Sequence, residues 1–311
     1  ITVNANINLV GAGLTYRFNN TDLDKDLIVN GAIDAAGSGN QTLQFGSFNQ
    51  SDAEIFINGN ITGSTSSRLT LNVIGQNVTM DGTVASTIGG AANSMRTIVR
   101  SGGVLTVTAN GSLGEGFLEI REGTVNLNNT TTPQVFDNNI EFGDPTQANG
   151  ISTLAIASGA IADVDVNINY TADTGFGNRG FVTGGTVDLS GASRTYTLND
   201  NTLVDVSLGN TEMTFSTNFK GTNANAGATN ADVEAFSFVG DGALTWDSTL
   251  SGNALELVDV LVFENAKTVI ATGSAGADFT NLRRELLVRQ RDNASFSDFA
   301  VEFDINGNEV I

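Results

Sequence analysis

The amino-acid sequence predicts an all-β fold, a parallel β-helix or β-solenoid with coils of about 25 residues. Three observations support this prediction. A short glycine motif recurs along the chain, apolar and polar residues alternate around each copy, and the composition favours strands and turns over helices. A repeat unit of this length cannot bury its own apolar face, but it can do so by stacking on copies of itself.

The glycine motif consists of a small polar residue, glycine, a small residue and an aliphatic residue. Clear copies stand at Asn30–Ile33, Asn58–Ile61, Asp81–Val84, Asn110–Leu113 and Ser158–Ile161, with looser copies at Gly185, Gly209 and Gly242. A β-sandwich or antiparallel barrel also uses short strands and turn glycines, but its turn signals should recur every 8 to 12 residues. We expect each motif to mark a corner of the coil. The glycines Gly31, Gly59, Gly82 and Gly111 should then have either a positive φ or a close backbone contact.

The alternation is clearest in the segment 161–170, where a strand with one buried face is expected. Its apolar set is Val164, Val166, Ile168 and Tyr170, and its polar set is Asp163, Asp165, Asn167 and Asn169. Similar alternation around residues 105–127 allows three strands in each coil.

Charge and composition exclude several classes of protein. Fourteen basic and 34 acidic residues give a net charge of −20, which disfavours binding to nucleic acid and to anionic membranes. No stretch approaches the ~18 consecutive apolar residues of a membrane-spanning helix, so we expect no membrane insertion. The chain contains no cysteine and starts at Ile1 without an apolar leader, as expected of an exported and processed protein.

Two segments carry a resemblance to a known family. Thr183–Thr197 and Ser101–Leu113 resemble the glycine- and threonine-rich repeats of bacterial autotransporter passengers, and the likeness extends over roughly residues 20 to 273. The resemblance implies a right-handed β-helix, displayed on or released from the cell surface and often without catalytic activity. The chain lacks the family's C-terminal membrane barrel, so either that part was removed or another pathway exports the protein.

The sequence offers little catalytic chemistry. Without histidine or cysteine, Ser-His-Asp triads, Cys-His dyads and histidine metal sites are excluded. Asp163 and Asp165 would project about 7 Å apart, near a glycosidase separation, but Asn167 and Asn169 continue the row and favour a solvated outer face. The segment Gly175–Gly180 matches G-x-G-x-x-G, yet no helical pattern follows it, so we expect a loop and no cofactor.

The C-terminal segment Asp304–Val310 superficially resembles a calcium loop. Its glycine is in the wrong position, and apolar residues flank Asn306-Gly307, which favours a hairpin turn. Structural calcium between coils stays open, although no specific motif supports it.

We divide the chain into a solenoid over residues 1–273 and a C-terminal segment, 274–311, that is either a cap or an interaction segment with a terminal hairpin. Residues 1–10 are either the first rung of the solenoid or a capping or exchanged strand. The expected self-association residues lie at the two chain ends: Ile1, Val3, Ile7, Leu9, Arg283, Arg284, Arg289 and Arg291. The arginines supply the charge opposite to that of the acidic chain.

These observations favour a non-catalytic extracellular structural protein, the subunit of a filament, sheath or surface layer that assembles head to tail. Its main partner would be itself, with cell-surface components as further partners. An adhesin or glycan-binding surface module is the alternative. A polysaccharide-acting enzyme is less favoured, because it would need clustered acids with nearby lysine or arginine in a groove.

Overall fold

The computed structural model describes backbone and side chains for residues 1–19, 25–35, 39–48, 53–64, 67–85, 95–114, 116–131, 133–136, 139–143 and 151–162. Beyond these it describes the strands from β17 (Ile161–Asp163) onward, mainly through their backbone pairing. All the elements described are strands. No helix in these parts of the chain is long and apolar enough to cross a membrane.

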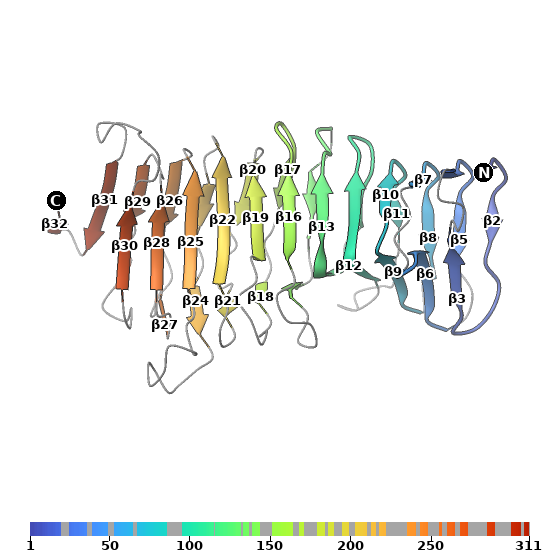
Figure 1. Ribbon diagram of the computed structural model, residues 1–311, viewed down its shortest axis with the longest axis horizontal. Coiled ribbons are helices and arrows are strands. Elements are labelled where there is room, and N and C mark those ends of the chain that lie inside the picture. Colours follow the sequence, from blue (N-terminus) through green and yellow to red (C-terminus); the bar gives the residue numbers. More distant parts are fainter. Residues whose placement is uncertain are drawn as a thin grey trace.

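The strands stack in three ladders along the long axis of the molecule, with the two termini at opposite ends (Figure 1). The first ladder contains β1 (Thr2–Val3), β4 (Leu27–Val29), β7 (Ile55–Ile57), β10 (Asn77–Met80), the ends of β12 (Met95–Val107) and β13 (Phe117–Leu127), β16 (Ser152–Ile156), β19 (Arg179–Thr183), β22 (Leu203–Gly209), β25 (Ala235–Gly240), β28 (Val260–Glu264) and β30 (Glu285–Arg289).

The second ladder is made of two sheets, which together contain β2 (Ile7–Asn8), β5 (Ile33–Ala35), β8 (Ile61–Gly63) and β11 (Val84–Ala85), then β14 (Gln134–Val135), β17, β20 (Thr186–Leu189), β23 (Met213–Phe215), β26 (Ala243–Asp247), β29 (Thr268–Thr272), β31 (Ala300–Ile305) and β32 (Asn308–Val310). The third ladder contains β3 (Thr15–Phe18), β6 (Gln41–Gly46), β9 (Leu69–Ile74), the starts of β12 and β13, β15 (Ile140–Phe142), β18 (Ile168–Tyr170), β21 (Thr195–Leu198), β24 (Asn218–Gly221) and β27 (Leu255–Glu256).

The register between coils confirms the predicted parallel β-solenoid. Thr2 lies beside Ile28 and Ile28 beside Phe56, and near the other end Val260 lies beside Glu285, so neighbouring coils are about 26 residues apart. The predicted coil length was about 25 residues. The right-handed turn of the coil stays a prediction.

The core runs through the middle of the solenoid as columns of apolar side chains, one from each coil. One such column is in direct register through six coils: Val29, Ile57, Met80, Val107, Leu127 and Ile156, all of them buried. Fully burying an aliphatic side chain stabilises a fold by about 1.5 to 3 kcal/mol. The apolar side chains that the period-two alternation places inside therefore hold neighbouring coils together.

Four glycines of the motif, Gly31, Gly59, Gly82 and Gly111, lie where two coils touch through their backbones, whereas Gly159 has a φ of 81° and no such contact. A Cβ atom placed on Gly59 would be 2.1 Å from the carbonyl oxygen of Gly31, and one on Gly82 would be 2.1 Å from that of Gly59. At Gly31 and Gly111 the nearest carbonyl oxygens, of Ala5 and Met80, would be at 2.0 and 2.5 Å. None of the four glycines has a positive φ. The prediction of close backbone contact is confirmed, and the absence of a side chain is what these corners require.

Asparagine side chains tie the coils together beside these glycines. Asn30 Nδ2 donates to Asn4 Oδ1 at 2.7 Å, and Asn58 Nδ2 donates to Asn30 Oδ1 at 2.8 Å. In the later coils the Thr108 hydroxyl donates to the carboxylate of Asp81. Asn30 and Asn58, which precede motif glycines, thus form a hydrogen-bonded column with Asn4 along the outside of the solenoid.

The parallel ladders continue past residue 273. β30 pairs with β28 and β31 pairs with β29, both in parallel. β32 then turns back and pairs antiparallel with β31, with Ile305 opposite Asn308, as a hairpin at 306–307 requires. The two turn residues lie outside the described residues, and the division of the chain at residue 273 stays a prediction.

Candidate functional site

The N-terminal residues expected to self-associate lie in the first coil. β1 pairs with β4 and β2 pairs with β5, so this segment forms a rung of its own solenoid. Ile1 is 70% exposed, whereas Val3, Ile7 and Leu9 are half-buried against the core.

The first coil leaves its apolar side chains uncovered on one side. Val3 and Ile7 are only partly buried, although their register partners Val29 and Ile33 are 0% exposed. We call the following set the first-coil surface: Ile1, Val3, Ile7, Leu9, Val10, Leu14, Tyr16 and Phe18. In the described part of the chain, no strand pairs with the outer edges of β1, β2 and β3.

The strand β30, which carries Arg289, lies at the opposite end of the long axis (Figure 1). Arg289 ends β30 and is the register partner of Glu264. Arg283, Arg284 and Arg291 lie outside the described residues. The fold separates Arg289 from the expected N-terminal self-association residues within one chain, so any contact between them would join different copies.

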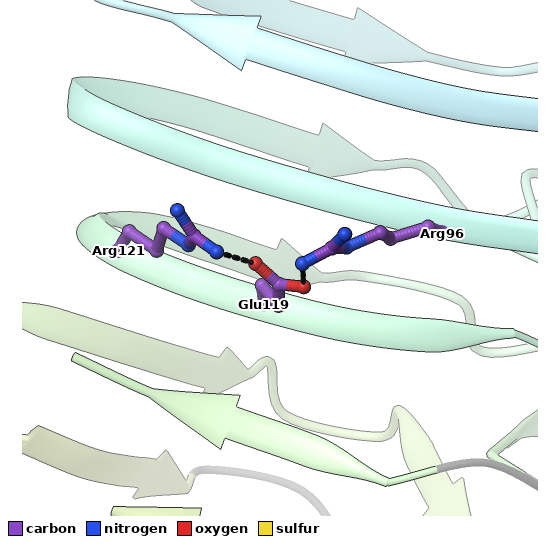
Figure 2. A network of polar contacts seen from close by, with 3 residues as sticks. All are labelled: Arg96, Glu119 and Arg121. Carbon is purple, nitrogen blue, oxygen red and sulfur yellow. Dashed lines mark ion pairs between the residues drawn. The ribbon is translucent and has the colours of Figure 1, made fainter. Parts of the chain in front are cut away.

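A second site, which we did not predict, lies on the outer face of the third ladder. Leu118 and Ile120 of β13 point into the core, so Glu119 between them lies on the outer side of the sheet. Its side chain is nevertheless 0% exposed and lies between two arginines (Figure 2). Arg121 Nη2 is 2.6 Å from Glu119 Oε2, and the Arg96 guanidinium forms an ion pair with Oε1.

Strand register explains how these three side chains meet. Ile98 of β12 lies directly beside Glu119, and Arg96 precedes Ile98 by two residues on the same face. Arg121 follows Glu119 by two residues along β13, also on that face. Glu119 therefore pairs with one guanidinium from its own strand and one from the previous coil.

A pocket of about 260 Å³ opens beside the ion pairs, which we call the arginine pocket. Its lining residues are Arg68, Met95, Arg96, Phe117, Glu119 and Glu141. The Arg96 guanidinium lies over the Phe117 ring, 5.7 Å from its centroid. Burial, followed by the nearby positive charges of Arg121 and Arg68, lowers the pKa of Arg96, while Glu141 acts in the opposite direction. Several guanidinium groups are thus held close together at the surface of a strongly acidic protein.

This cluster could not be recognised in the sequence because its members are far apart along the chain. Arg68, Arg96 and Glu141 come from β9's N-terminal flank, β12 and β15, and only the stacking of coils brings them together. Only the positions of these residues along the chain could have indicated the cluster. Arginine and glutamate occupy the polar, alternating positions of segments that lie one coil apart.

The structure does not test the remaining candidate motifs. The side chain of Asp163, all of Asp165 and most of Gly175–Gly180 lie outside the described residues. Among the residues that are described, no group of three or more acidic residues is placed to hold a metal ion. Calcium binding between coils stays a prediction.

Comparison with known proteins found no matching family model, no similar curated protein and no similar solved structure. The fold alone therefore defines the class of this protein as a parallel β-solenoid. The resemblance to autotransporter passengers rests only on the glycine- and threonine-rich segments.

Proposed function

We propose that this protein is a non-catalytic structural subunit of an extracellular filament, sheath or surface layer, in which copies stack head to tail. The first-coil surface is the observation that carries the proposal. It combines exposed apolar side chains, such as Val10 at 82% and Leu14 at 47%, with strand edges that have no partner in the described part of the chain. Such an edge favours the addition of another strand.

The arrangement of the ladders supports a head-to-tail contact. β1 and β30 are the first and last strands of the same parallel ladder, at opposite ends of the molecule. A second copy whose β1 lay beside β30 would continue the ladder with unchanged strand direction. β32 covers the outer edge of β31, so the second ladder could not continue in the same way. The contact is heterologous and produces an open polymer rather than a closed dimer.

Charge sets the conditions for this assembly. Subunits with a net charge of −20 repel one another, so the contact needs apolar burial and local opposite charge. We propose that Arg283, Arg284, Arg289 and Arg291 supply that charge. Added salt screens the overall repulsion between subunits and also weakens the attraction that these arginines supply. Export to the cell surface belongs to the same proposal, which the autotransporter-like repeats support.

The test compares polymer formation by the full chain and by matched variants, using light scattering and electron microscopy. Val10→Asn with Leu14→Asn, deletion of residues 1–10, and reversal of the four arginines to glutamate should each reduce assembly. Val135→Asn with Ile151→Asn is the control, because these side chains are also exposed, at 42% and 59%, but lie in later coils. Polymers that form equally well in all variants would contradict the proposal.

A further inference from the structure

The outer face of the first ladder carries no charged side chain in the strands whose side chains the structure describes. Buried residues such as Val78 and Met80 alternate there with partly exposed ones such as Thr79. Asp26 and Glu54 lie at one edge of this face, just before β4 and β7. We call the following outward set the uncharged face: Ile28, Phe56, Asn77, Thr79, Val104, Thr106, Thr124, Asn126, Thr153 and Ala155.

Strand register makes this face continuous along the solenoid. One of its rows places the following residues side by side from coil to coil: Phe56, Thr79, Thr106, Asn126 and Ala155. The row continues at the register positions Val182, Ser207 and Val239 of later strands. It first meets a charged residue at Glu264, in β28. From β10 to β25 the neighbouring row, which begins at Asn77, has one charged position, Asp205.

The outer face of the third ladder differs, because its described strands carry many charges. These include Arg17, Arg96, Glu119, Arg121 and Glu141. The whole chain has a net charge of −20, so two copies repel each other across most approaches. A long strip without charge is where that repulsion is weakest. Depletion of charged residues also distinguishes the core of a protein interface from the rest of a protein surface.

We propose that the uncharged face is a lateral contact with a second copy of the chain. Threonine, valine and isoleucine are stiff at χ1, so ordering them in an interface costs little conformational entropy. Their side chains repeat at the strand spacing of about 4.8 Å, so the same face on a second copy presents matching rows. Two sheets with such faces can pack directly on each other. The contact uses the same surface on both copies, so it joins two molecules and then stops.

One pair of copies should associate only weakly. The nine strands from β4 to β25 give a face about 43 Å long, at about 4.8 Å for each strand. With a width of about 10 Å, the contact covers about 400 Å² of each copy, roughly half of a standard interface. In a head-to-tail polymer the contact area would grow with every added copy, and this step rests on the proposed function. The lateral contact would then join two filaments side by side.

The first test uses single cysteines, since the chain contains none of its own. β13 is the middle one of the nine strands, so the symmetry of the contact places Thr124 opposite the Thr124 of the second copy. Under mild oxidation, Thr124→Cys should form disulfide-linked dimers at least about tenfold faster than Thr130→Cys, because contact raises the local thiol concentration. Thr130 is the control, because it is more exposed but lies outside the uncharged face. Equal rates, or no dimers of Thr124→Cys, would overturn the proposal.

The second test adds charge to the face and measures filament width by electron microscopy. Thr79→Glu with Thr124→Glu should give single filaments, whereas the unchanged chain gives paired ones. Thr83→Glu with Thr130→Glu is the control, because it adds two charges at exposed positions outside the face and should leave the pairs intact. Added salt should increase pairing, since it screens the repulsion and the described part of the face has no charged group to lose an attraction. Single filaments of the unchanged chain would overturn the proposal.

The two tests separate the lateral contact from the head-to-tail contact. If no filaments form, the head-to-tail proposal fails, and cross-linking of Thr124→Cys alone decides the lateral one. Thermal melting verifies that each variant is folded, and cross-linking also decides if Thr79→Glu with Thr124→Glu does not fold. A neutral polysaccharide is the other occupant that an uncharged face could accept. Cellulose binding that is lost in Thr79→Glu with Thr124→Glu, without dimers of Thr124→Cys, would assign the face to a glycan and overturn the proposal.

Discussion

The solenoid uses glycine at two corners for two different reasons. At the corner of Gly31, Gly59 and Gly82 the backbone conformation is ordinary, and a side chain is excluded by the carbonyl oxygen of the previous coil. At the corner of Gly46 and Gly75 the backbone itself is left-handed, with φ of 83° and 58°. The first corner requires only the absence of a Cβ, whereas Gly46 and Gly75 combine an unusual backbone dihedral with a Cβ position 2.5 and 2.7 Å from a carbonyl oxygen.

The later coils show that the left-handed backbone at the second corner restricts the residue type less than the steric exclusion at the first corner does. In β12 the corner residues with positive φ are Ser101, at 56°, and Gly102, and in β13 the corner residue is Glu122, at 57°. A side chain can therefore adopt the left-handed conformation there at a moderate energetic cost. In the described coils the first corner has no such exception from Gly31 to Gly82. Steric exclusion by a neighbouring backbone tolerates less variation than backbone strain does.

The largest expected effect is at the first corner. Gly59→Val places a branched side chain against the carbonyl oxygen of Gly31, 2.1 Å from its Cβ, and both coils would have to separate. We expect a loss of about 3 kcal/mol or more, measured as a lower melting temperature. The control is Gly159→Val, where the nearest atom, Thr130 Cγ2, lies 3.6 Å away and only the φ of 81° opposes the change. Equal losses at both positions would contradict the distinction between steric exclusion and backbone strain.

An intermediate effect is expected at the second corner of an early coil. Gly75→Ala combines a φ of 58° with a Cβ that would lie 2.7 Å from the carbonyl oxygen of Ser47. The backbone strain and the contact together should destabilise the fold by about 2 kcal/mol. Melting temperature again measures the effect. A loss greater than that of Gly59→Val would reverse the proposed ranking.

A smaller effect is expected from the asparagine column beside the first corner. Asn30→Ala removes the hydrogen bonds to Asn4 and from Asn58, both at the surface. We expect a loss of about 1 kcal/mol, because each exposed hydrogen bond contributes little after exchange with water. Asn8→Ala, at an exposed position on β2, serves as the control. If both substitutions left the melting temperature unchanged, the column would have no measurable role in joining the coils.

The smallest effect should be a gain in stability. Glu122→Gly relieves the left-handed strain at φ 57° but increases the freedom of the unfolded chain. The two effects partly offset each other, and we expect a net stabilisation of about 0.5 kcal/mol. The same substitution at Arg121, which has no positive φ, should destabilise instead. A drop in melting temperature for Glu122→Gly would show that the corner does not strain this residue.

The sequence predicted the motif glycines and the hairpin pairing for local reasons. Asn-Gly pairs mark corners and turns through the conformations that those two residues allow, and Gly31 and Gly59 repeat with the period of the coil. The positions with positive φ were less predictable from the sequence than the motif glycines and the hairpin pairing. Ser101 and Glu122 carry it without any special residue type, because the bend between two ladders requires it and the neighbouring coils hold it in place.

The alternation of residue types and the period of the glycine motif determined the solenoid by themselves, since each coil repeats the same local pattern and only stacking can bury it. Which side chains from different coils meet was decided only by the tertiary structure. Arg96 and Glu119 come together because 21 residues separate paired positions in the first part of β12 and β13, for example Ile98 and Glu119, whereas 23 residues or more separate the pairs of most other coils. Coil length varies with the loops, which carry no periodic signal, and a shift of one residue would move Glu119 to the opposite face of the sheet.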